Sequence, residues 1–197
     1  MIQVDPGTLF FAAIFTNNIL LTNFLGLCPF LSISREVRAA LGLGVAVVFV
    51  MTCTAVINYL VYYHVLEPLS LTHFRYIVFI VIIAAFVQLV EMSVERFFPA
   101  LYFVLGIFLP LITVNCAILG ASLFMIIREY TLWQSIAYGA GSGIGWMLAI
   151  IAVGACREKL QQSARLPKGL EGPAITLIIT GLMSLAFMAF SGMIQIQ

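Results

Sequence analysis

The chain has 197 residues, of which 63% are hydrophobic and 9% are charged, and its mean hydropathy is +1.14. Soluble domains contain about a quarter charged residues, so this composition excludes a soluble domain, which would lack the polar side chains to cover its core. The formal net charge of +1 provides no basic surface for nucleic acid. The composition therefore predicts an integral membrane protein with contacts to lipid and none to nucleic acid.

Six runs of the sequence are long and apolar enough to be considered as membrane spans. A spanning helix needs roughly 20 mostly apolar residues, and stretches without Asp, Glu, Lys, Arg or His mark the candidates. The third candidate is short and continues past Glu91. The expected spans are residues 6–34, 39–63, 76–94, 97–127, 130–156 and 172–197.

The first and fourth runs are longer than one span requires, and both contain residues that interrupt helices. Gly26 and Pro29 fall late in the first run, and Gly106 and Pro110 interrupt the fourth. Gly and Pro are also common in membrane helices, so their presence alone proves no repeat. Interrupted segments at matching positions nevertheless predict two related halves, with the functional site where the halves meet.

Three spans in each half would give the halves opposite orientations in the membrane. The fold that we predict is therefore all-α, with six transmembrane helices arranged as two inverted three-helix repeats and with helices one and four broken. A single membrane domain, residues 1–197, would contain repeat one at about 6–96 and repeat two at about 97–197.

The basic residues predict the orientation of the chain. Seven of the nine Lys and Arg residues fall on one side of the predicted spans, namely Arg35, Arg38, Arg96, Arg157, Lys159, Arg165 and Lys168. By the positive-inside rule that side is cytoplasmic, so both termini are expected outside. The longest cytoplasmic loop, expected at 157–171, is either a docking surface for a soluble partner or only a topology signal.

Four cysteines are present, and two of them lie beside the predicted helix breaks. Cys53 and Cys156 are interpreted as ordinary free cysteines, which behave as small hydrophobic residues. Cys28 and Cys116 differ, because a broken helix leaves backbone N–H groups that can donate to an anionic sulfur site. A two-iron cluster normally needs four thiolates, so these two would form half a site that a partner of similar fold completes. Buried cysteines without a ligand are the alternative that the residues alone leave open.

Polar side chains also occur inside the apolar runs. They either join helices by hydrogen bonds or bind a cation through oxygen, and the carboxylate of Glu91 is close enough to the cytoplasmic edge to be solvated. Residue by residue, the helix-joining role is the simpler interpretation. The polar residues are Asn17, Asn18, Thr22 and Asn23 in the first run, Gln88 and Glu91 in the third, and Thr113 and Asn115 in the fourth.

Two motifs carry a resemblance to a known family. Residues 23–30 read Asn-Phe-Leu-Gly-Leu-Cys-Pro-Phe, and residues 105–116 read Leu-Gly-Ile-Phe-Leu-Pro-Leu-Ile-Thr-Val-Asn-Cys. Both resemble the membrane proteins shared by two redox pumps, namely the D and E subunits of the Na⁺-translocating NADH:quinone oxidoreductase and the A and E subunits of the Rnf ferredoxin:NAD⁺ oxidoreductase. The resemblance covers nearly the whole chain. Residues 141–150 and 157–160 are similar to the E subunit of the quinone reductase, whereas Cys28-Pro29-Phe30 is similar to the A subunit of Rnf.

The resemblance implies a mechanism. Two homologous six-helix subunits of opposite topology would each contribute two cysteines, here Cys28 and Cys116, to one intramembrane [2Fe–2S] cluster. Cys53 and Cys156 lie outside the matching motifs. Electrons would pass to a flavin-bearing subunit on the outer side from a cytoplasmic iron–sulfur/flavin subunit, coupled to export of Na⁺ or H⁺. The chain would then be one subunit of a translocase in the bacterial inner membrane, without a complete active site of its own.

Two other classes of protein fit the same patterns. In a small secondary transporter with inverted repeats, intramembrane Asn and Thr residues would bind the substrate or ion, and the cysteines would be replaceable. The residues concerned are Asn17, Asn18, Asn23, Thr113 and Asn115. A purely structural membrane subunit is the third interpretation. The tryptophans Trp133 and Trp146 are interpreted as structural in all three.

Overall fold

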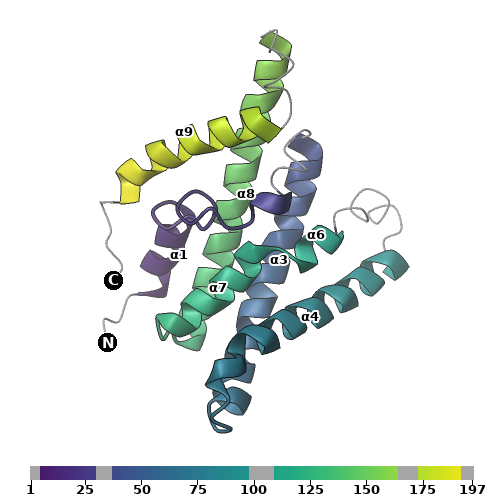
Figure 1. Ribbon diagram of the computed structural model, residues 1–197, viewed down its shortest axis with the longest axis vertical. Coiled ribbons are helices and arrows are strands. Elements are labelled where there is room, and N and C mark those ends of the chain that lie inside the picture. Colours follow the sequence, from purple (N-terminus) through teal and green to yellow (C-terminus); the bar gives the residue numbers. More distant parts are fainter. Residues whose placement is uncertain (1–4, 30–36, 98–108, 164–172, 192–197) are drawn as a thin grey trace.

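The structure is a computed structural model that describes residues 5–29, 37–97, 109–163 and 173–191. Within these ranges every regular element is helical, which agrees with the all-α prediction (Figure 1). A π-helical turn (Tyr62–Leu66) and a 3-10 turn (Thr72–Phe74) lie between α3 and α4. The α-helices are α1 (Pro6–Ile14), α3 (Val37–Val61), α4 (Arg75–Phe97), α6 (Leu109–Thr113), α7 (Cys116–Ile127), α8 (Leu132–Ser163) and α9 (Pro173–Ser191).

Three helical stretches in the described residues are long and apolar enough to cross a membrane. They are Ala40–Leu66, Thr72–Arg96 and Leu132–Leu160, and they correspond to the second, third and fifth expected spans. Two shorter apolar stretches are Leu111–Ile127, which joins the end of α6 to α7, and Ala174–Ala189. The membrane character of the chain is thus confirmed, while the six-span count and the inverted repeat stay predictions.

The helices α3 and α8 pack side by side at the centre (Figure 1). Glycines of α8 allow this close approach: a Cβ atom at Gly143 would lie 2.9 Å from the Val48 Cα atom, and one at Gly139 would lie 3.0 Å from the Ala55 Cβ atom. Small residues serve the same purpose in many membrane helix pairs. The glycine-rich stretch 139–145 is therefore a packing surface of α8.

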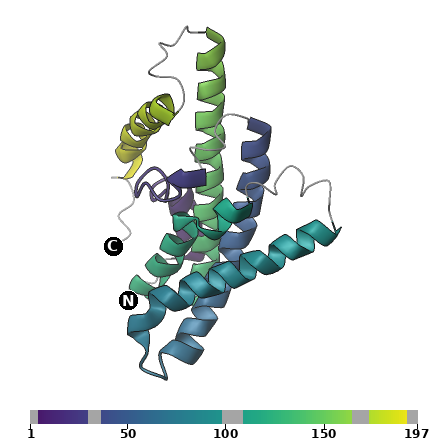
Figure 2. The same ribbon diagram turned by 45° about the vertical axis from the view of Figure 1, so that its right-hand side comes forward.

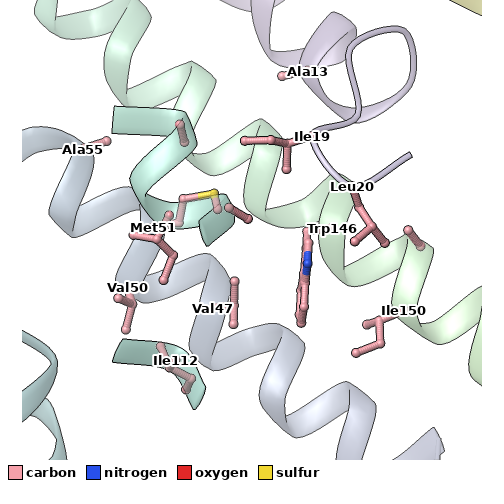
Figure 3. Packing of buried hydrophobic residues seen from close by; sticks show 14 of the residues in the cluster. Ala13, Ile19, Leu20, Val47, Val50, Met51, Ala55, Ile112, Trp146 and Ile150 are labelled. Atoms are coloured by element: carbon pink, nitrogen blue, oxygen red, sulfur yellow. The ribbon is translucent and has the colours of Figure 1, made fainter. Parts of the chain in front are cut away.

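The buried core lies between this pair and the helices packed on it. Both α1 and α7 contact the α3–α8 pair, whereas α4 and α9 lie at the periphery (Figure 2). Figure 3 shows the indole of Trp146 in the middle of the core, among side chains of α3, α8 and the segment after α1, including Leu20, Val47 and Ile150. All of these side chains are fully buried.

The first expected span is broken, but earlier than Gly26 and Pro29 predict. Helix α1 ends at Ile14, and residues 15–26 form turns before helical residues resume at 27–29. The Asn18 side chain explains the position, because its Oδ1 atom accepts from the backbone N–H groups of Leu20 (3.0 Å) and Leu21 (3.4 Å). Such local side-chain bonds compete with the helical pattern.

The fourth expected span is broken as well, between α6 and α7. Within the described residues the interruption falls at Val114 and Asn115; Pro110 is the second residue of α6, and the residues before Leu109, where the interruption predicted from Gly106 and Pro110 would begin, lie outside the described ranges. Proline is tolerated in the first turn of a helix, whereas an asparagine that caps a new helix marks a real boundary. Gly106 lies outside the described residues.

The loop expected from residue 157 onward does not begin there. Helix α8 continues to Ser163, and Arg157 is 2% exposed within it. Its Nη1 atom donates to the Thr176 Oγ1 atom of α9 at 2.9 Å, and Leu160 packs against the core. The hydrogen bond of Arg157 and the apolar packing of Leu160 therefore stabilise the helix beyond the fifth apolar run, which ends at residue 156. Residues 164–172 lie outside the described ranges.

Candidate functional site

The two interrupted segments meet at a sulfur atom. The backbone N–H of Gly26, in the irregular segment after α1, donates to the Cys116 Sγ atom at 2.9 Å. Cys116 is the first residue of α7 and is partly buried. Cys28 follows Gly26 by two residues and its side chain is exposed. The structure therefore brings together the two chain segments that carry the predicted ligands Cys28 and Cys116.

Gly26 has a conformation and surroundings that only glycine fits. Its φ angle is +84°, a region that other residues adopt only with strain. A Cβ atom there would lie 2.5 Å from the Trp146 Nε1 atom, 3.0 Å from the Ala117 Cβ atom and 3.1 Å from the Asn115 Oδ1 atom. The Trp146 Nε1 group also donates to the Gly26 carbonyl oxygen at 3.4 Å. The absence of a side chain at Gly26 thus lets its peptide reach the sulfur.

Asn115 forms the start of α7 beside the cysteine. Its Oδ1 atom accepts from the backbone N–H of Ala117 at 3.0 Å, the usual bond of an asparagine N-cap. The side chain is 2% exposed, yet its Nδ2 group has no hydrogen-bond partner among the described residues. Leaving a buried donor unsatisfied costs about 1–3 kcal/mol, so a donor is available here for an acceptor outside the described residues.

Two further side chains fix the irregular segment onto the helices behind it. The Asn18 Nδ2 group donates to the carbonyl oxygens of Gly145 in α8 (2.8 Å) and Ile14 (3.2 Å). The Ser184 Oγ group of α9 donates to the Leu21 carbonyl oxygen at 2.6 Å. The bond from Ser184 satisfies a carbonyl group of the irregular segment, where the helical pattern is interrupted. Together with the Asn18 bonds it holds the segment that carries Gly26 in place from two sides.

The remaining predicted residues lie elsewhere or are more exposed. All four cysteines are free thiols; Cys53 is partly buried in α3 and Cys156 is exposed on α8. Within the described ranges no three His, Cys, Asp or Glu side chains gather in a group that could hold a metal ion. Among the other intramembrane polar residues, Asn23 and Gln88 are exposed, and Asn17, Thr22, Glu91 and Thr113 are partly buried.

Sequence reasoning missed the part that Trp146 plays at this site. The residue was interpreted as structural, and 120 residues separate it from the Gly26 carbonyl oxygen that it contacts. No local pattern around Trp146 signals that contact. It depends on how α8 packs behind the irregular segment, which the spacing of residues does not reveal.

The fold and site define an integral membrane protein in which two interrupted helical segments meet at a cysteine. Residues 7–194 match the family model described as Rnf-Nqr subunit, membrane protein. The chain belongs to this family.

Three relatives illustrate the match. The E subunit of the Na⁺-translocating NADH-quinone reductase of Marinobacter nauticus is 51% identical over 195 residues, which is 94% of this chain and 96% of the relative. Its counterpart in Neisseria meningitidis serogroup C is 50% identical over 190 residues, with the same coverage. The A subunit of the Na⁺-translocating ferredoxin:NAD⁺ oxidoreductase complex of Acetobacterium woodii is 51% identical over 182 residues, 92% of this chain and 94% of the relative.

Proposed function

We propose that this chain is a membrane electron-transfer subunit of a redox-driven ion pump, of the Na⁺-translocating NADH:quinone oxidoreductase type. The names of its relatives, subunits of Na⁺-translocating oxidoreductases, support this class. In the proposal the chain shares an intramembrane [2Fe–2S] cluster with a homologous partner and relays electrons from the cytoplasmic to the outer side. One observation carries it: the Gly26 N–H group lies 2.9 Å from the Cys116 Sγ atom, in the segment that also holds Cys28.

The residues present fit such a cluster on three counts. Cys28 and Cys116 are free thiols, and thiolates are the usual ligands of iron–sulfur clusters. The Gly26 N–H group already donates to one of these sulfurs. The Asn115 Nδ2 group beside it is buried and has no partner among the described residues, and a sulfur acceptor would satisfy it. The chain thus provides two ligands and two hydrogen-bond donors.

The contribution of each residue follows from this arrangement. A bound [2Fe–2S] cluster accepts and releases one electron at a time. Cys28 and Cys116 would lose their thiol protons and bind iron as thiolates, and Gly26 would stabilise the negative charge on the Cys116 sulfur. Trp146 and the neighbouring core would keep water from the inner side, while Cys28 remains on the exposed side.

The exposed position of Cys28 suits a site that a second chain completes. In the proposal a homologous six-helix subunit of opposite topology provides the other two thiolates. Electrons arrive from an iron–sulfur/flavin subunit in the cytoplasm, and they leave to a flavin-bearing subunit on the outer side. The chain itself has six spans in two inverted repeats, lies in the bacterial inner membrane and has both termini outside. The two breaks, after Ile14 and at Val114 and Asn115, support the repeat because they occur in matching spans.

The equivalent subunit of the Rnf complex is the second candidate. The relatives from the two systems match at the same 51% identity, so identity does not favour either of them. The transporter interpretation is less well supported, because both polar atoms of Asn18 already bond to the protein itself. Because the Asn18 Oδ1 atom already accepts hydrogen bonds from the Leu20 and Leu21 amides, it is not free to bind an ion.

The test is the iron and acid-labile sulfide content of the purified complex, together with the EPR spectrum of its reduced state. Cys28→Ala and Cys116→Ala are made singly, and Cys53→Ala is the matched control within the membrane. We expect each of the first two variants to lack one two-iron cluster, while the control keeps it. Unchanged iron content and spectrum in all three variants would overturn the proposal in favour of a transporter or a structural subunit.

A further inference from the structure

We propose that Trp146 is a positioning residue, which holds the Gly26 peptide against Cys116 and thereby sets the reduction potential of the site. This inference rests on the proposed function, because it concerns the cluster that Cys116 would bind. It adds a residue of α8, remote in sequence from both cysteine motifs, to the residues that determine how readily the site accepts an electron.

The geometry places Gly26 between Cys116 and Trp146. On one side its N–H group donates to the Cys116 Sγ atom at 2.9 Å. On the other side its carbonyl oxygen faces the Trp146 Nε1 atom at 3.4 Å, and a Cβ atom at Gly26 would lie 2.5 Å from that nitrogen. The hydrogen bond to Trp146 is long, so the edge of the indole acts by direct packing as well. Gly26 is therefore in direct contact with both the sulfur and the edge of the indole.

Trp146 is itself held firmly. Its side chain is 0% exposed and lies in the centre of the core (Figure 3). The carbonyl oxygen of the preceding residue, Gly145, accepts from the Asn18 Nδ2 group at 2.8 Å. This bond ties the same turn of α8 to the start of the irregular segment. The indole is therefore a rigid support rather than a side chain that adjusts to its neighbour.

The electrostatic consequence has a definite sign. Adding an electron makes the cluster and its thiolates more negative, and a hydrogen bond to sulfur stabilises the more negative state more strongly. A firmly held Gly26 N–H group therefore raises the reduction potential. If the indole is removed, the peptide gains freedom, the bond to sulfur weakens, and the potential falls.

The chain offers a matched control in the other tryptophan. Trp133 lies near the start of the same helix and is 73% exposed. Trp133→Phe makes the same chemical change as Trp146→Phe, but far along α8 from Gly26. Trp146→Phe keeps an aromatic ring in the core while it removes Nε1 and the edge that touches Gly26.

The experiment is an EPR-monitored redox titration of the purified complex with a chemical reductant. It follows the one-electron reduction of the cluster, in which no bond is made or broken. At the wild-type midpoint, we expect Trp146→Phe to show a roughly two- to tenfold lower ratio of reduced to oxidised cluster, the effect of weakening about one hydrogen bond. Trp133→Phe should titrate like wild type.

A second measurement needs no variant and covers the case in which Trp146→Phe fails to assemble. In wild-type complex exchanged into deuterium oxide, pulsed EPR should detect strongly coupled exchangeable deuterons at the reduced cluster, from the Gly26 amide and from the Asn115 Nδ2 group. If Trp146→Phe retains the cluster signal with an unshifted midpoint, the positioning role alone is overturned. The same conclusion follows if wild type shows the cluster signal without the deuteron coupling. Absence of any cluster signal in wild type overturns the proposed function instead.

Discussion

The Gly26 amide nitrogen and the Cys116 sulfur lie 2.9 Å apart, although 90 residues separate them in the sequence. The contact joins the irregular segment after α1 to the first residue of α7. Gly26 is non-helical and Cys116 begins a helix, so the Gly26 N–H group is free to bond outside a helix of its own and the Cys116 side chain lies at a helix start. A continuous helix through the first segment would use the Gly26 amide internally and leave the sulfur without this donor.

The interruptions therefore have a chemical consequence as well as a structural one. Inside a membrane protein, irregular backbone is tolerated where side chains satisfy its polar groups. Asn18 and Ser184 do this around the first segment, through bonds to backbone groups of Leu20, Leu21 and Gly145. The Asn115 side chain does it for the second segment through its bond to the Ala117 amide. The Gly26 N–H group bonds instead to the Cys116 sulfur, and the Asn115 Nδ2 group has no hydrogen-bond partner among the described residues.

Replacing Gly26 by alanine should damage the site and the fold. The φ angle of +84° is strained for alanine, and its Cβ atom would lie 2.5 Å from the Trp146 Nε1 atom. We expect a loss of about 1–3 kcal/mol in unfolding free energy, seen as a lower melting temperature in detergent, together with a loss of bound iron.

The matched control is Gly181→Ala in α9, where nothing lies within 4 Å of an added Cβ atom among the described residues and no positive φ is present. There alanine should be neutral, or stabilising by up to about 1 kcal/mol because of its helix propensity. Equal melting temperatures for the two variants would contradict the close packing described at Gly26.

Two substitutions at Asn115 separate its cap from its unpaired donor. Asn115→Asp keeps an oxygen for the Ala117 N–H group, so α7 should remain stable, but it replaces the Nδ2 donor with negative charge. Asn115→Ala removes the cap and should cost about 0.5–2 kcal/mol. We expect the aspartate variant to melt close to wild type and yet hold less iron or titrate at a lower potential. A wild-type iron content and potential in Asn115→Asp would show that the donor has no role at the cluster.

Composition and charge-free runs were sufficient to predict the membrane class, the all-helical fold and three of the spans. Those features depend on the solvation of whole segments, to which every residue of a run contributes. Interruptions of the first and fourth spans could also be predicted from glycine and proline, although in the described residues the breaks begin after Ile14 and at Val114. Pro110 lies within α6, and the first break follows from Asn18, whose side chain competes with the helical pattern.

The contacts around Gly26 could not be predicted in the same way. They depend on the packing of α8 behind the irregular segment, which places Trp146 against a carbonyl group 120 residues away. The length of α8 was underestimated for a similar reason. Arg157 looks like the start of a polar loop in the sequence, but Thr176 of α9 accepts a hydrogen bond from its guanidinium group.

Removing the Thr176 hydroxyl, which accepts the hydrogen bond from Arg157, should loosen the contact between α8 and α9. Thr176→Val keeps the shape of the side chain but deprives the buried guanidinium of Arg157 of one partner, at a cost of about 1.5–3 kcal/mol. Thr180→Val is the control one turn later: Thr180 is equally buried, but its hydroxyl donates to the Thr176 carbonyl oxygen within the same helix. Thermal unfolding in detergent should separate the two variants. If both melt alike, the Arg157 bond does not stabilise the packing of α9.

Substitution of Asn18 distinguishes a structural asparagine from a transport site. Asn18→Leu removes two donated bonds, to Ile14 and Gly145, and the acceptor for the Leu20 amide, all inside the protein. Because each buried polar group left unpaired costs about 1–3 kcal/mol, we expect a large drop in melting temperature and poor assembly.

Asn17→Leu is the control for this substitution, since the Asn17 side chain makes no hydrogen bond within the described residues and is only partly buried. In the complex, Asn17→Leu should retain full quinone reduction and Na⁺ export. A stable Asn18→Leu complex that reduces quinone at the wild-type rate but no longer exports Na⁺ would instead identify Asn18 as part of an ion pathway. Loss of both activities together with loss of assembly is the result that a structural asparagine requires, because the irregular segment that carries Gly26 then loses its bond to Gly145 of α8.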